Sequence, residues 1–325
     1  MKNIFKNSKD LFSQEIMSSF FQRNCLLYLK ADKLISLKIF PKKRISKNIL
    51  VLYKLYLEKD KKFFQRNIWG KTMEKDQFKL LEYLSKTKVK KYLPNYFEYI
   101  TPLKFSLSEE IAGESTRNLE RNFSFWKENI AEIGQILVEF KKINFPPKTL
   151  KVYAKGEEKK FLKSSLKEIR DYSPKVWEKY KNLGIFYIKN LFSHCWKNYA
   201  FSFSHFDFQP SNVFYDKKGK TLKIVDFDFS RKFCPVLSLA NFWVHFYVMT
   251  RYHFPKEKVL PLCDKLLQPY CRKSQLKRNF LECFNLFKLR AIIDIAQMTA
   301  ATFKKPTQKS QRVFEKLDEL LKICL

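Results

Sequence analysis

The segment from His205 to Asp228 constrains this chain more than any other feature of its sequence. It contains a polar loop, a predicted hairpin and a pair of carboxylates, in the order His205-Phe206-Asp207-Phe208-Gln209-Pro210-Ser211-Asn212, residues 213–225 and Asp226-Phe227-Asp228. The runs 213–215 and 222–225 are β-prone, and the Asp and Gly between them are typical of a hairpin connection. A loop carboxylate, an amide and two carboxylates at the ends of paired strands are the groups that magnesium-dependent phosphoryl transfer requires.

Each of these residues also has a purely structural interpretation. An Asp before a Phe is commonly a turn or cap residue, and a single His is commonly a structural side chain. The ordered set of all four polar groups favours the functional interpretation.

On these motifs the chain resembles the aminoglycoside phosphotransferase and choline kinase superfamily, which is related to the protein kinases. Its loop matches the pattern H-x-D-x-x-x-x-N, and Asp226-Phe227-Asp228 matches the metal motif D-[FWY]-[DE]. The run Asp226-Phe227-Asp228-Phe229-Ser230-Arg231 is similar to the D-F-D-R-G-R run of bacterial lipopolysaccharide core and Kdo kinases.

The resemblance implies roles for the loop and the hairpin. Asp207 would be the catalytic base, His205 would brace the loop, and Asn212 and Asp226 would be magnesium ligands. Asp228 would support the site or bind a second metal ion. Two residues depart from the pattern: Phe206 replaces a small or polar residue, and Ser238 replaces an Asp, so that a capping carboxylate is expected to be missing.

The resemblance also implies an α+β fold of two lobes, protein kinase-like, with a small β-rich N-lobe and a larger, mainly helical C-lobe. We expect the nucleotide-binding N-lobe at 1–108, a hinge at 109–114, and a C-lobe at 115–325 that carries the catalytic loop and the metal-binding hairpin. Apolar periodicity predicts helices around 130–140, 284–298 and 313–324, and a buried helix at 237–249.

A kinase-like N-lobe needs a lysine for the nucleotide phosphates. Lys54 lies in the middle of a predicted strand at 50–57, and the helix-like stretch that begins at Glu74 offers an ion-pair partner. Gln77 is the alternative at that position, because the same apolar residues follow it at the same intervals. A charged partner favours Glu74.

The adenine is expected at residues 109–113, which resemble the hinge between kinase lobes. Backbone groups of Glu109 and Ile111 would hold its edge. The alternative is an ordinary strand end followed by a glycine turn. The loop that covers the nucleotide would lie near residues 30–33, between two β-prone runs, although this loop contains no glycine.

Several classes of protein are excluded. The six glycines form neither a dinucleotide-binding G-x-G-x-x-G motif nor a P-loop. We find no apolar run of membrane-spanning length and no secretion signal. The seven cysteines contain no C-x-x-C pair and are expected to be free, mostly buried thiols of a cytoplasmic protein.

Charge is the main indication of the substrate. With 64 basic and 32 acidic residues, the net charge of +32 should attract anions and repel polycations. The expected cofactors are ATP and Mg²⁺, and the expected acceptor is a sugar-containing or lipid-linked hydroxyl compound, anionic and similar to a lipopolysaccharide core. Peripheral contact with the anionic inner membrane surface would suit this charge. A coding bias towards lysine explains the charge equally well.

Other functions remain open at this point. The acceptor could be choline, an amino sugar or an aminoglycoside, or the chain could be an idle kinase-like scaffold or a basic nucleic-acid binder. Nucleic-acid binding is disfavoured, since the sequence shows no helix-turn-helix, RRM or zinc-finger pattern. The sequence does not determine the oligomeric state.

Overall fold

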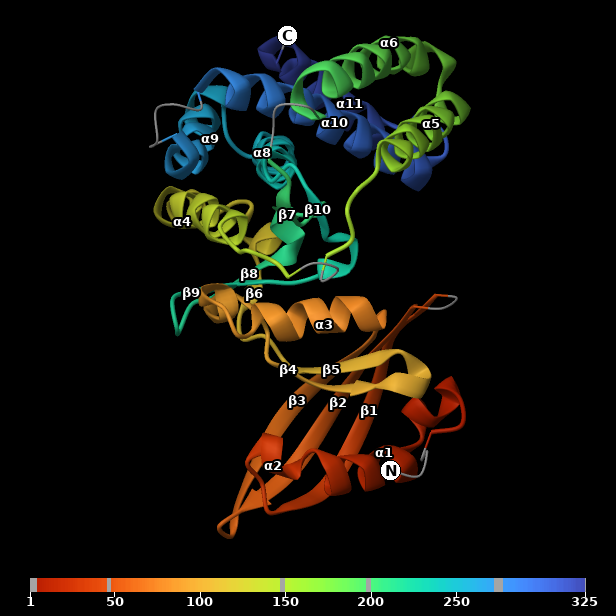
Figure 1. Cartoon of the computed structure of the whole chain (residues 1–325), viewed down its shortest axis with the longest axis vertical. Helices are drawn as coiled ribbons and strands as arrows, with labels where there is room; N and C mark the ends of the chain where they lie inside the picture. The colour runs from red at the N-terminus through yellow and green to blue at the C-terminus, as the bar shows by residue number, and fades with distance from the viewer. Residues whose placement is uncertain (1–4, 46–47, 147–149, 197–199, 272–276, 325) are drawn as a thin grey trace. The chain divides into compact units, whose positions relative to one another are not determined.

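The computed structural model describes residues 5–45, 48–146, 150–196, 200–271 and 277–324. The chain forms two compact units (Figure 1): the first comprises Met1–Gly113 and Lys223–Asp228, and the second comprises Glu114–Leu222 and Phe229–Leu325. The expected division, with boundaries at 108 and 115, assigned all residues after 115 to one lobe. In the structure, residues 223–228 belong to the first unit instead, so that Asp226 and Asp228 lie in the first unit and Asp207 and Asn212 in the second.

The first unit is built on a five-stranded antiparallel sheet of order β1-β2-β3-β5-β4. Its strands are β1 (Lys33–Ile45), β2 (Asn48–Lys59), β3 (Lys62–Thr72), β4 (Tyr96–Ile100) and β5 (Phe105–Glu109). Its helices are α1 (Gln14–Asn24), α2 (Leu26–Leu29) and α3 (Lys75–Leu84). We expected residues 30–33 to connect two strands, but they lead from α2 into β1. Lys30 caps α2 in the left-handed conformation.

The two faces of this sheet differ because side chains alternate along a strand. Val51, Tyr53, Leu55 and Leu57 of β2 are fully buried and share one apolar core with Phe21 of α1. Each such side chain contributes roughly 1.5–3 kcal/mol relative to an exposed position. The alternate residues of β2 and β3 form the opposite face.

Gly70 of β3 allows the strand to lie close to this core. A Cβ atom at this position would lie 2.3 Å from the ring of Phe105 and 2.9 Å from that of Tyr53. Both rings are fully buried and cannot move aside. We therefore expect only glycine to fit at position 70.

The second unit is mainly helical, so the predicted combination of a β-rich part and a larger helical part is confirmed. Its helices are α4 (Phe123–Lys141), α5 (Lys155–Tyr172), α6 (Pro174–Asn190), α8 (Val236–Thr250), α9 (Lys256–Cys271), α10 (Lys277–Phe303) and α11 (Gln308–Cys324). Its short strands are β6 (Glu114–Ser115), β7 (Ser202–Ser204), β8 (Val213–Asp216), the start of β9 (Thr221–Ile224) and β10 (Arg231–Phe233).

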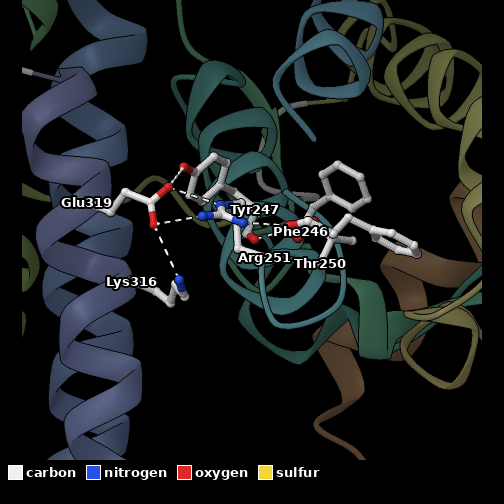
Figure 2. Close-up of polar contacts among 7 residues, drawn as sticks. Phe246, Tyr247, Thr250, Arg251, Lys316 and Glu319 are labelled. Atoms are coloured by element: carbon white, nitrogen blue, oxygen red, sulfur yellow. Dashed lines mark hydrogen bonds and ion pairs between the residues drawn. The ribbon is translucent and has the colours of Figure 1, made fainter. Parts of the chain in front are cut away.

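Helix α8 is buried on nearly all sides, as expected for residues 237–249. Its C-terminal turn is tied to α11 by the carboxylate of Glu319, which contacts Tyr247 and Arg251 (Figure 2). The Tyr247 hydroxyl donates at 2.6 Å and Arg251 Nε at 3.0 Å. Burial opposes the charge of Glu319, but the hydrogen bonds from Arg251 and Tyr247 outweigh it and lower the pKa to about 2.

The cysteines differ from the expectation in one respect. Cys195 and Cys283 form a disulfide, with Cα atoms 5.5 Å apart, whereas Cys25, Cys234, Cys263, Cys271 and Cys324 are free thiols. The expectation that all seven thiols are free was therefore wrong. The pair is separated by 88 residues, and such connectivity cannot be deduced from spacing.

Within the described residue ranges, no helix combines the length and the apolar character needed to cross a bilayer.

Candidate functional site

The loop of residues 205–212 follows β7 in the second unit and begins with a buried histidine. The His205 side chain is 1% exposed, and its ring centre lies 5.6 Å from that of Phe208. Its backbone N–H donates to Oγ of Ser238 on α8 at 2.8 Å. The position fits the predicted bracing role.

Phe206 bends the loop sharply. Its φ of 57° lies in the left-handed region, which costs a bulky residue of order 1–3 kcal/mol. The backbone N–H of Asp207 donates to the carbonyl of His205 at 2.6 Å across this bend. The Phe206 ring packs against Tyr153 and Phe233, with ring centres 4.5 and 5.5 Å away. These contacts oppose the strain and aim the next residue, Asp207.

The carboxylate of Asp207 is oriented by two amides of the same loop. Gln209 Nε2 donates to Oδ1 at 2.7 Å, and Asn212 Nδ2 donates to Oδ2 at 2.9 Å and to the Asp207 carbonyl at 2.8 Å. Because the nitrogen of Asn212 is used in this way, its amide oxygen is the end that can coordinate a cation. Asp207 and Asn212 thus belong to one hydrogen-bonded group.

Helix α8 holds the loop through two polar residues that sequence reasoning did not assign. Ser238 accepts from His205 as described, and its Oγ lies 3.2 Å from that of Ser204. Asn241 Nδ2 donates to the carbonyl of Phe206. The expected capping carboxylate is indeed absent at 238, but the serine hydroxyl contacts the loop in its place.

A buried ion pair lies behind Phe206. The guanidinium of Arg290 on α10 lies 5.6 Å from the Phe206 ring centre, and its Nε donates to Glu158 on α5 at 2.9 Å. Tyr187 donates to the same carboxylate oxygen at 2.8 Å. Burial opposes the charge of Arg290, but the nearby Glu158 raises its pKa above the ordinary value. The pair fixes the surroundings of the bent loop.

The first unit contains a second cluster, centred on Lys71 at the end of β3. Its ammonium lies 2.6 Å from Asp226 and 2.6 Å from Asp228, and all three side chains are partly exposed. Burial opposes the charge of Lys71, but both carboxylates raise its pKa above the ordinary value. Burial raises the pKa of Asp228, and Lys71 opposes that shift. Two acidic groups therefore share one cation.

The Asp226–Asp228 segment is held by backbone contacts as well. Asp226 has a φ of 63°, a conformation that non-glycine residues adopt rarely. Gln77 Nε2 on α3 donates to the carbonyl of Asp228, and Gln77 Oε1 accepts from the N–H of Glu74 at 3.1 Å. The residue that we considered as the alternative to Glu74 thus contacts the predicted metal-binding segment.

Lys54 does not reach these carboxylates. It lies on the same sheet face, but the register places Leu50, not Lys54, opposite Lys71. Lys54 is therefore four residues along the strand from the position opposite Lys71, a distance of about 13 Å. The Lys54 ammonium instead lies 5.1 Å from the ring centre of Phe40.

Glu74 also faces a different partner from the one expected. It precedes the first residue of α3, and its carboxylate pairs with the ammonium of Lys104 at 2.9 Å. Both side chains are largely exposed. A residue at a helix N-terminus points back towards the preceding turn, which explains why Glu74 does not pair with Lys54.

The predicted hinge lies at the end of β5. The Glu109 N–H donates to the carbonyl of Asn95 at 3.0 Å, so this group is already satisfied. A hollow of about 240 Å³ in the first unit is lined by Glu109, Glu110 and Ala112 together with residues 65–67 of β3. Ile111 lies between Glu110 and Ala112 in the segment that follows β5. Asn67 and Lys71 share one sheet face by alternation.

The donor chemistry fits a hard divalent cation. Asp226 and Asp228 supply adjacent carboxylates, which Mg²⁺ prefers, and they already converge on a positive charge, that of Lys71. Among the residues that the structure describes, no group of three or more His, Cys, Asp or Glu side chains could hold a metal alone. A cation at Asp226 and Asp228 would thus need other ligands, such as phosphate oxygens or water.

Lys71 is the residue that sequence reasoning missed. One signal could have identified it: the predicted helix at Glu74 follows directly, so the strand before that helix must end near Thr72 and carry Lys71. The choice of Lys54 came from the apolar run 50–57, which is the more obvious strand.

Comparisons with known proteins concern the fold. No family profile and no curated protein matches the sequence. Among solved structures, the choline kinase of Cryptosporidium parvum has 13% identity and a TM-score of 0.61 and covers 95% of each chain. An amicoumacin kinase in complex with AMP-PNP and Ca²⁺ has 14% identity and a TM-score of 0.61, covering 93% of this chain and 96% of that one.

An ADP-bound aminoglycoside phosphotransferase is a third match, with 14% identity and a TM-score of 0.52, covering 90% of this chain and 97% of that one. Identities this low concern the fold and not the activity. Together with the sheet and helices described above, they show that this chain has the two-lobed, protein kinase-like fold shared by choline kinases and aminoglycoside phosphotransferases.

Proposed function

We propose that this protein is an ATP- and Mg²⁺-dependent phosphotransferase that phosphorylates a hydroxyl group of a small acceptor. The observation that carries the proposal is the contact of Lys71 with both Asp226 and Asp228. A lysine beside paired carboxylates is what phosphate and metal binding in this reaction class requires. The structural matches, a choline kinase, an aminoglycoside phosphotransferase with ADP bound and an amicoumacin kinase with AMP-PNP bound, support the same reaction.

The contacts described above support a role for each residue. Lys71, in place of Lys54, would contact the nucleotide phosphates. Asp226 and Asp228 would hold the magnesium ion, which when bound supplies positive charge to the phosphate oxygens. Asp207 would accept the hydroxyl proton and orient the attacking oxygen, since Gln209 and Asn212 fix its carboxylate.

The nucleotide would extend along one face of the sheet of the first unit. Its adenine would lie in the hollow lined by Glu109 and Glu110, with Ile111 supplying a backbone contact, and its phosphates would lie at Lys71. Asn67 borders the hollow and lies about 13 Å from Lys71 along β3, a spacing that suits an extended nucleotide.

The acceptor would be sugar-containing or lipid-linked, similar to a lipopolysaccharide core. The net charge of +32 supports an anionic acceptor and weighs against a polycationic aminoglycoside. The same charge would allow peripheral binding at an anionic inner membrane surface from the cytoplasm. The names of the matched structures favour choline or an aminoglycoside-like compound as the alternative acceptor class.

Two variants test the reaction. Asp226→Ala should abolish Mg²⁺-dependent ATP turnover, because it removes one of the two carboxylates that would hold the cation. Asp207→Asn should retain MgATP affinity, measured by isothermal titration, but lose phosphate transfer. Unimpaired turnover in both purified, folded variants would refute the mechanism. Salt-sensitive oligonucleotide binding by a wild-type protein without ATPase activity would favour a nucleic-acid binder instead.

A further inference from the structure

The second unit contains a hollow of about 290 Å³ whose wall includes part of the 205–212 loop. Gln209 and Ser211 form one side, and residues of α8, α10 and α11 form the remainder. Gln209 is also the residue that donates to Asp207 Oδ1 at 2.7 Å. The hollow is therefore one side chain away from the proposed catalytic base.

Its volume restricts the occupant. About 300 Å³ is the lower end of the range for small-molecule pockets. A single sugar ring or a compound of similar size can enter, whereas a multi-ring aminoglycoside cannot be enclosed.

Its polar lining favours hydroxyl groups. Thr299 and Thr302 donate their own hydroxyl protons to the backbone carbonyls one helical turn earlier, each at 2.7 Å. Their oxygens are thus left as hydrogen-bond acceptors for a ligand O–H. Ile295, Met298 and Val313 supply apolar surface beside them, which suits the hydrophobic face of a sugar ring.

Its charges favour an anion. Arg117 lines the hollow, is exposed, and makes no ion pair in the part of the chain that the structure describes. The carboxylate of Glu120 lies in the wall as well but is 3.0 Å from His253 Nε2. Burial, assisted by Arg117, lowers the pKa of His245 to about 4, so this wall residue is neutral at pH 7.

We propose that this hollow binds the acceptor, and that the acceptor is a monosaccharide-sized polyol with an anionic substituent that Arg117 contacts. The inference rests on the proposed phosphotransferase function and specifies its substrate class. It excludes quaternary amines and polycations as the preferred acceptors, because no uncommitted carboxylate in the described wall would compensate their charge beside Arg117.

The test compares three sugars that share one ring and differ in charge. Glucose 6-phosphate, glucose and protonated glucosamine are titrated calorimetrically into the full-length protein at about 10 mM and pH 6.5 without nucleotide. We expect glucose 6-phosphate to bind most tightly and glucosamine most weakly. A charge-assisted contact of this kind strengthens binding by about 10-fold.

Variants then locate the site. Arg117→Met should reduce the affinity for glucose 6-phosphate to about that for glucose, whereas Lys160→Met, which removes one exposed charge from α5, should have no effect. Met298→Trp should prevent binding of all three sugars by filling the hollow. Met298 is 46% exposed, so this variant is expected to fold, and its thermal unfolding midpoint serves as the check.

The outcomes are separable from those of the proposed function. Equal or tighter binding of glucosamine, binding unaffected by Met298→Trp, or no binding of any of the three sugars would each refute the acceptor inference. MgATP titration of the same wild-type sample tests nucleotide binding independently. A protein that binds MgATP but none of the sugars would retain the phosphotransferase proposal and lose only this substrate class.

Discussion

The Lys71 cluster of the first unit and the 205–212 loop of the second differ in how their polar side chains are held in place. Lys71, Asp226 and Asp228 are partly exposed and hold each other by charge. The loop is held from behind by the buried side chains of Ser238 and Asn241 and by the packing of the half-buried Phe206 ring. A cluster that must exchange partners with a ligand stays accessible, whereas a loop that must aim one carboxylate is fixed by a buried scaffold.

The largest effect is expected at the buried pair behind the loop. Arg290→Met leaves the fully buried Glu158 without its cationic partner, which should lower the free energy of unfolding by about 3–5 kcal/mol. Urea unfolding of the purified variant measures this. The double variant Arg290→Met/Glu158→Leu should recover most of the loss. If Arg290→Met alone were as stable as wild type, the pair would not support the loop.

The next prediction concerns the accessible cluster. Lys71→Met should lower kcat/KM for ATP hydrolysis by about 100- to 1,000-fold, because it removes the charge that both carboxylates and the phosphates share. Lys54→Met is the matched control on the same sheet face and should change kcat/KM by less than about 2-fold. Steady-state ATPase assays of both variants decide, and the reverse ranking would restore Lys54 as the phosphate ligand.

A smaller effect is expected where α8 holds the bend. Asn241→Ala leaves the Phe206 carbonyl without this donor, which should cost about 1–3 kcal/mol and lower kcat while the Kd for MgATP stays unchanged. Asn190→Ala on α6 removes a comparable side-chain bond, from Nδ2 to the Phe186 carbonyl, at an exposed position. An equal loss of kcat in both variants would contradict a specific role for Asn241.

The smallest effect is a pH dependence at the tie between α8 and α11. The pKa of Glu319 in the folded protein is lowered to about 2, whereas the unfolded value is about 4.3. The charged carboxylate therefore contributes fully to the free energy of unfolding above about pH 4.3, and this contribution is lost as the pH falls towards 2. Allowing for solvent screening, we expect the contribution to be about 1–2 kcal/mol.

Unfolding of Glu319→Gln and wild type between pH 2 and pH 6 tests this tie, with the exposed Glu315→Gln as control. The difference between wild type and Glu319→Gln should shrink as the pH falls. A difference that is constant over this range would show that the carboxylate charge is not involved.

The local elements were largely predictable from sequence, but their partners were not. Apolar periodicity identified α4, α10 and α11, an apolar run identified α8, and the motif letters identified the loop around Asp207, since these signals lie within short windows. The contact of Lys71 with Asp226 spans 155 residues, and no local pattern encodes it. The need for a charged partner favoured Glu74 over Gln77. In the structure, however, Glu74 forms an ion pair with Lys104, and the neutral Gln77 donates to the carbonyl of Asp228.

The absence of a side chain at Gly70 has a consequence for variation at this site. Since the Phe105 ring occupies the space that any larger residue would need, a saturation library at this codon should return glycine alone among well-folded clones. Alanine there would push β3 outward and carry the neighbouring ammonium with it. The absence of a Cβ atom at Gly70 thus determines how far β3, and with it Lys71, lies from the core.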